Sequence, residues 1–166
     1  MGANGAFERR RTELALVTGV SDVPDKAVVD SFVSSVTPGH ANALMLAYLE
    51  RACIAHIFGS VIFVHGGVSH DAAGWVPGDD AKVEDPGEWV RRLNAWAASQ
   101  LAEFKLDPFT GGNSKKRAGH ALMDYGVPGG AGGRSVVYCG HLKGGCPAKV
   151  DSKVNRSTSR GSSYQQ

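Results

Sequence analysis

The stretch that decides how this chain is interpreted is Val61-Ile62-Phe63-Val64-His65-Gly66-Gly67-Val68-Ser69-His70. Its first four residues are β-branched or aromatic, and such a run predicts a buried strand. The strand ends at a histidine and two glycines. Because glycine has no Cβ, a Gly-Gly pair permits a tight turn and lets a metal, phosphate or substrate approach the backbone closely. Ligands bind at the C-terminal ends of strands in parallel α/β sheets, so His65 is placed for chemistry.

Three interpretations of this loop remain open from the residues alone. In the first, His65 is a metal ligand through a neutral imidazole nitrogen, completed by carboxylates and other histidines. In the second, His-Gly-Gly resembles the oxyanion-hole loop of lipase-like α/β-hydrolases, which requires a serine in Gly-x-Ser-x-Gly. That motif is absent, because Ser114 and Ser135 both lack the second glycine. In the third, the loop is a glycine turn without a chemical role.

Length and composition exclude several classes of protein. The chain has 166 residues, enough for one domain, with 42% apolar and 20% charged residues and no apolar run of membrane-spanning length. A net charge of +2 gives no global basic field of the kind that nucleic-acid binding requires. The N-terminus carries no secretory signal, and the cysteines Cys53, Cys139 and Cys146 form no Cys-x-x-Cys pair. We therefore expect core thiols in a reducing, cytoplasmic compartment.

Apolar periodicity predicts a helix-rich chain. We expect helices over 6–17, from Pro24 onward, over 40–58 and over 87–105, the last with a core-facing stripe that includes Trp89 and Trp96. Residues 134–139 predict a second buried strand, followed by Gly140-His141. Because this strand ends beside a histidine, as 61–64 does, His141 is a second candidate metal ligand, with a turn histidine as the alternative. The polar residues 151–166 predict a disordered tail.

Several segments together carry a family resemblance. The stretch from Val61 to His70 resembles the His-Gly-Gly motif of the calcineurin-like metallophosphoesterases, the superfamily that includes the Ser/Thr protein phosphatases. Four further segments are similar to family members from algae, plants and protists: Gly5 to Arg10, Glu88 to Trp96, Asp124 to Gly130 and Arg134 to Tyr138. The resemblance covers residues 1–150 and implies an α/β fold, a helix-rich partial α/β/β/α sandwich in which helices enclose a pair of mixed sheets.

The family's chemistry implies cofactors and site residues. Its members hold a pair of divalent metal ions, typically Mn, Fe or Zn, bridged by a hydroxide that attacks phosphorus. The ligands come from Gly-Asp-x-His, Gly-Asp-x-x-Asp-Arg-Gly, Gly-Asn-His-Glu, the His-Gly-Gly histidine and a late Gly-His. Only His65 matches with the right context, and His141 is a displaced candidate for the late histidine. Ser69, His70 and Arg134 are substrate-side candidates, Arg134 because a guanidinium matches phosphate oxygens.

The absent motifs shape the functional prediction. No Gly-Asp-x-His, Gly-Asp-x-x-Asp or Gly-Asn-His occurs in the chain, so 1–150 corresponds to the middle and later part of such a domain. One imidazole does not hold two divalent ions. We therefore expect a metal-dependent phosphoester hydrolase fragment, weakly active or inactive alone, whose family substrate is a phosphorylated molecule. The alternative is a non-catalytic protein-interaction module derived from the phosphatase scaffold. The sequence leaves the oligomeric state open.

Overall fold

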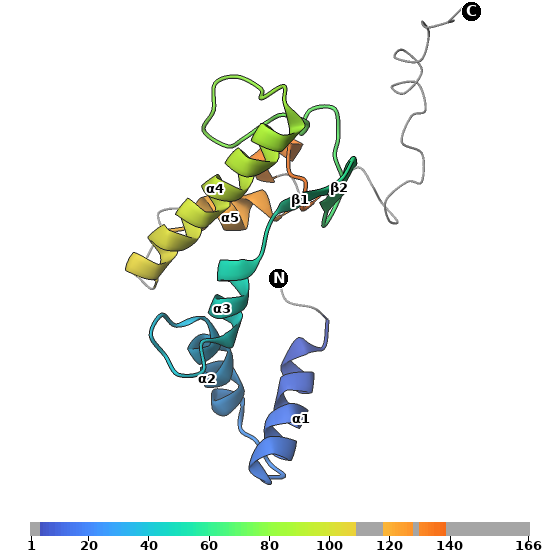
Figure 1. Ribbon diagram of the computed structural model, residues 1–166. Helices are drawn as coiled ribbons and strands as arrows, with labels where there is room; N and C mark the ends of the chain where they lie inside the picture. The colour runs from blue at the N-terminus through green and yellow to red at the C-terminus, as the bar shows by residue number, and fades with distance from the viewer. Residues whose placement is uncertain (1–3, 109–117, 128–129, 139–166) are drawn as a thin grey trace, which may run out of the picture.

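The computed structural model describes residues 4–108, 118–127 and 130–138 (Figure 1). Three helices, α1–α3, lie at one end of the molecule, and α4 and α5 lie side by side at the other, with a β-hairpin beside them. The elements in chain order are α1 (Ala6–Thr18), α2 (Asp25–Val36), α3 (Leu44–Arg51), β1 (Ala55–Phe58), β2 (Val61–Val64), α4 (Pro86–Leu106), α5 (His120–Tyr125) and a 3₁₀ turn (Gly130–Gly133). The sandwich implied by the family resemblance stays a prediction.

The helices α1 and α2 confirm the predictions from apolar periodicity. α1 ends at Gly19, whose φ of 71° is left-handed and whose N–H donates to the Ala15 carbonyl at 2.9 Å. The guanidinium of Arg11 joins the two helices through an ion pair with Asp25, 2.5 Å between Nη2 and Oδ1. Hydrogen bonds to Glu8 and Asp25 raise the pKa of Arg11 above its ordinary value.

The predicted helix over 40–58 is wrong in its second half. The helix α3 ends at Arg51, and Ala55–Phe58 forms strand β1 instead. Residues 55–58 alternate in burial, with Ala55 and Ile57 facing inward and His56 and Phe58 outward, which is the two-residue period of a strand. Gly59, with φ of 59°, opens a two-residue turn into β2 and so ends a strand, not a helix.

The strand predicted over 61–64 is present, but the prediction that it is buried is wrong for one of its two faces. β2 pairs antiparallel with β1, Phe58 opposite Val61 and Ala55 opposite Val64. Val61 is 53% exposed and Phe63 is 56% exposed, so only one face of the hairpin packs against the protein. A parallel pair would have required a helical crossover, whereas two residues suffice for the antiparallel hairpin.

The core lies between the inner face of the hairpin, α4 and α5. The helix α4 confirms the prediction over 87–105. Asp85 caps its N-terminus, because the Asp85 carboxylate accepts the Glu88 N–H at 2.7 Å. Hydrogen bonds from Arg91 and Arg92 lower the pKa of Glu88 to about 2. The buried side chains of the core are Ala55, Ala72, Val76, Trp89, Val90, Leu93, Tyr125 and Val136.

The prediction of a strand over 134–139 is also wrong for the residues that the structure describes, 134–138, because none of them lies in a strand. Ser135 bends the backbone there, because its Oγ accepts hydrogen bonds from the N–H groups of Val137 and Tyr138, both at 3.0 Å. A hydroxyl that satisfies the following N–H groups competes with strand pairing. Among the helices that the structure describes, none has the length and apolar character needed to cross a bilayer. The predicted tail, His141, Cys139 and Cys146 lie outside the described residues.

Candidate functional site

The His65-Gly66-Gly67 loop is fixed by a segment seventy residues further along the chain. The N–H groups of Gly66 and Gly67 both donate to the Val136 carbonyl oxygen, at 2.9 and 3.2 Å. The approach is so close that a Cβ on Gly66 would lie 2.6 Å from the Val137 carbonyl oxygen. Glycine is therefore required at position 66 by the packing of two backbones, whatever the loop binds.

Tyr125 holds the segment against which the loop packs. Its hydroxyl accepts a hydrogen bond from the Val136 N–H at 3.1 Å, and the side chain is only 1% exposed. The Tyr125 ring stacks on Trp75, with centroids 6.3 Å apart, and lies 5.2 Å from the Trp96 ring in a tilted arrangement. This aromatic cluster positions Val136, and Val136 in turn positions the glycines. The sequence prediction missed Tyr125, whose position at the end of a short helix before Gly126 gave only a local signal.

The His65 side chain is exposed and lines a cavity of about 640 Å³ among α3, α4 and α5. Its polar neighbours in the lining are Cys53, Asn94 and the ion pair between Glu50 and Lys105. The remaining lining is mostly aliphatic. Cys53 is exposed, so the prediction of a core thiol is wrong for this cysteine.

Arg134 lies in a different cavity from His65. Its guanidinium carbon stands 5.3 Å from the centroid of the Trp75 ring, a cation–π contact. The cavity, of about 440 Å³, also contains Asp71, Asp79, Asp80 and Lys82. The three carboxylates outnumber the two cationic side chains, Arg134 and Lys82, and so oppose the binding of a phosphate dianion there.

The other substrate-side candidates are exposed to solvent or bind the backbone. His70 has a side chain that is 99% exposed, with Nδ1 3.6 Å from an Asp71 carboxylate oxygen. Ser69 Oγ accepts the Ala72 N–H at 3.1 Å and so stabilises the turn that follows the loop. Ser135, one of the two serines weighed as a nucleophile, is buried, and Ser114 lies outside the described residues.

The metal pair implied by the resemblance does not fit the described residues. Residues 4–108, 118–127 and 130–138 contain no group of three or more His, Cys, Asp or Glu side chains placed to hold a metal ion. A divalent ion needs several ligands in fixed geometry, and His65 provides one. His141, the second candidate, is not among the residues described, so no catalytic step is derived through a metal.

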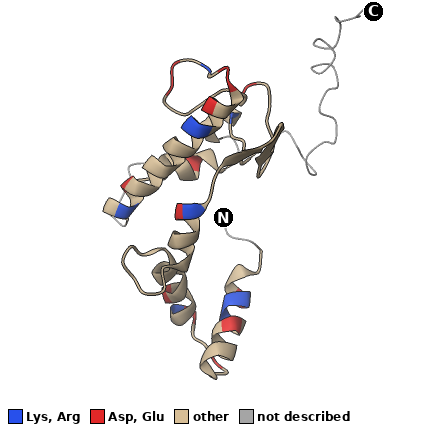
Figure 2. Cartoon of the chain, in the orientation of Figure 1, with Lys and Arg blue, Asp and Glu red and all other residues tan. Residues whose placement is uncertain are grey.

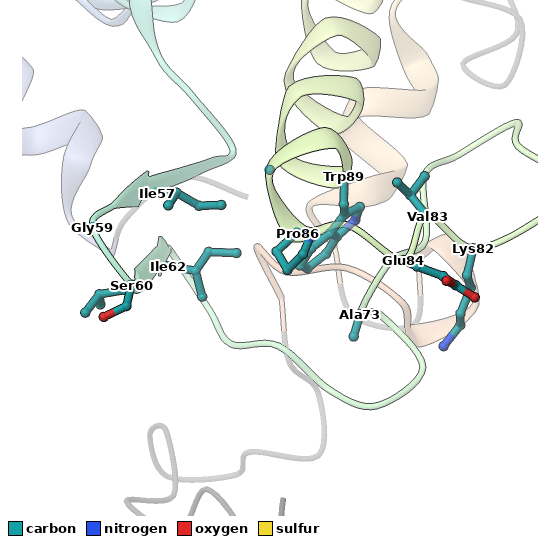
Figure 3. A pocket seen from close by; sticks show the side chains of 13 residues that line it. Ile57, Gly59, Ser60, Ile62, Ala73, Lys82, Val83, Glu84, Pro86 and Trp89 are labelled. Atoms are coloured by element: carbon teal, nitrogen blue, oxygen red, sulfur yellow. The ribbon is translucent and has the colours of Figure 1, made fainter. Parts of the chain in front are cut away.

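A larger cavity, of about 920 Å³, lies at the tip of the hairpin (Figure 3). Ile57 and Ile62 point from the inner face of the hairpin toward Pro86 and Trp89 at the start of α4. The loop before α4 closes another side with Val83. No sequence pattern predicted this cavity, because it forms between segments that are distant in the chain.

Comparison of the chain with models of protein families, with curated proteins and with solved structures gave no match.

Proposed function

We propose that this chain contributes the His-Gly-Gly loop to a metal-dependent phosphoester hydrolase domain of the calcineurin-like type. The observation that carries the proposal is the exposed His65 imidazole at the end of β2, followed by a glycine turn that Val136 holds in place. A metal ligand must be both accessible and fixed, and this loop meets both requirements. Because the other ligands of such a centre have not been identified in the chain, these residues alone hydrolyse phosphoesters weakly or not at all.

Turnover of an aryl phosphate in the presence of Mn²⁺ tests this proposal. We expect the rate with the 166-residue protein to stay close to the rate with Mn²⁺ alone, and His65→Ala to leave it unchanged. His40→Ala is the matched control, because His40 is also exposed and lies outside the loop. A metal-dependent rate that His65→Ala abolishes and His40→Ala preserves would show a complete catalytic centre and contradict the predicted inactivity.

A second candidate function is a non-catalytic interaction module on the same scaffold. Two observations favour it: Arg134 and His65 line different cavities, and the outer face of the hairpin is apolar and exposed. Binding of a protein partner that is unaffected by a chelator and by His65→Ala would support this function over the hydrolase.

A further inference from the structure

The outer face of the hairpin presents an exposed apolar surface. Phe58 is 76% exposed, and Val61 and Phe63 are more than half exposed. The register places Phe58 beside Val61 and His56 beside Phe63, so these four side chains form one continuous patch. A two-stranded hairpin has little stability alone in water. Here α4 supports the inner face, whereas the outer face has no such support within the described residues.

The two edges of the hairpin differ in how they are covered. Phe58 and Val61 close the two-residue turn and therefore form a hydrogen-bonded pair. Hydrogen-bonded pairs alternate along an antiparallel ladder, so the N–H and C=O groups of residues 55, 57, 62 and 64 point outward, away from the partner strand. At the β1 edge, the Asn94 side chain accepts from the N–H groups of Ile54 and Ala55, at 2.9 and 3.3 Å, and donates to the Ala55 carbonyl at 2.8 Å. At the β2 edge, the described part of the chain provides no such partner for Ile62 and Val64.

The hairpin also lacks the charges that usually protect an open edge. Residues 52–70 include no Asp, Glu, Lys or Arg, in a chain in which one residue in five is charged. Figure 2 shows the same contrast, since charged side chains occur on α1, on α4 and in the loop before α4, but not on β1 or β2. Natural edge strands commonly carry lysine or proline to prevent pairing with another chain.

We propose that β2 pairs antiparallel with β2 of a second copy of this chain, across a two-fold axis, in a four-stranded sheet of order β1-β2-β2-β1. A two-fold interface must be complementary to itself, and an uncharged strand meets this condition because no like charges face each other. The pairing rests on neither metal binding nor catalysis.

The outward groups of β2 select the register. If Ile62 of one copy lies opposite Val64 of the other, both outward residues of each strand exchange N–H and C=O bonds, about four bonds in all. Phe63 then lies opposite Phe63 of the second copy, and the two outer apolar patches join. On the inner face, Ile62 lines the cavity at the tip of the hairpin (Figure 3).

Sedimentation velocity on the whole chain, over a wide range of concentration, tests the pairing. We expect a concentration-dependent dimer, weakened about tenfold or more by Phe63→Lys or by Phe63→Glu, because like charges then meet at the axis. Mixing the two variants should restore a dimer, since Lys then faces Glu. Leu106→Lys is the control, because it also adds a charge at an exposed apolar residue, but one remote from β2. This variant should leave dimerisation unchanged.

Amide hydrogen exchange provides a second measurement that does not depend on variants. Exchange at Ile62 and Val64 should slow as protein concentration rises, whereas exchange at Ile57, on the opposite edge, should not change. If the protein is monomeric at every concentration, the proposal is overturned, and a strand from a different protein becomes the candidate partner of the β2 edge. Dimers that persist in Phe63→Lys, or variants that fail to restore each other, overturn the proposed axis as well.

Discussion

Replacing Tyr125 by alanine is expected to lower the free energy of unfolding by about 3–5 kcal/mol. The ring is 1% exposed and packs between Trp75 and Trp96, so its removal leaves a cavity at the centre of the core. It also removes the acceptor of the Val136 N–H. Urea unfolding followed by circular dichroism measures the change without relying on tryptophan emission, which the substitution itself alters.

Tyr125→Phe separates the ring from the hydroxyl. This variant keeps the packing and loses the hydrogen bond, so we expect a smaller loss, about 1–2 kcal/mol. Because Val136 holds the glycine loop, the amides of Gly66 and Gly67 should exchange faster in Tyr125→Phe than in the wild type. Equal losses for the two variants would mean that the ring contributes nothing beyond its hydroxyl, contrary to the packing described.

Replacing Gly66 by alanine is expected to destabilise the protein by about 3 kcal/mol, because the added methyl group has no free space. Its nearest neighbours would be the carbonyl oxygen and carbon of Val137, at 2.6 and 2.9 Å. These are backbone atoms, so the whole 134–138 segment must move away from the loop. Thermal or urea unfolding, read by circular dichroism, measures the loss.

Gly126→Ala provides the matched control for this change. A Cβ at Gly126 would lie 3.7 Å from its nearest neighbour, the Met123 carbonyl oxygen, and the residue has a right-handed φ of −88°. Alanine should therefore be tolerated there, with little change in stability. A Gly66→Ala variant as stable as Gly126→Ala would show that the loop does not pack against Val136 and Val137.

Local patterns predicted the helices better than the strands. α1, α2 and α4 are recognisable because their signals lie within each segment: apolar spacing in all three, with Gly19 after α1, Pro24 before α2 and Asp85 before α4. Residues 53–58 fit both a helical and a strand period over so short a run, so the helix over 40–58 was extended too far. Only the tertiary setting, with Asn94 bound to the start of β1, decides between the two.

The candidate site was also predictable only where local sequence patterns encode it. The strand–turn pattern predicts His65 and its glycines at the end of a strand, and the structure places His65 exposed there, with the two glycines half-buried against Val136. The support from Val136 and Tyr125 was not predictable, because hydrogen bonds between residues 66 and 136 leave no periodic trace in a single sequence. Arg134 was assigned to phosphate from its chemistry alone, whereas its contact with Trp75 depends on the fold.

Titration of the protein with Mn²⁺, followed by the paramagnetic broadening of its NMR signals, tests the role of His65 most directly. We expect weak binding with broadening centred on residues 65–67, lost in His65→Ala and retained in His40→Ala. A single imidazole explains weak binding, since the described residues do not assemble the several ligands of a tight site around it. Sharp signals at 65–67 while the acidic residues 79–85 broaden would contradict a metal-binding role for His65, and tight equimolar binding would contradict the incomplete centre.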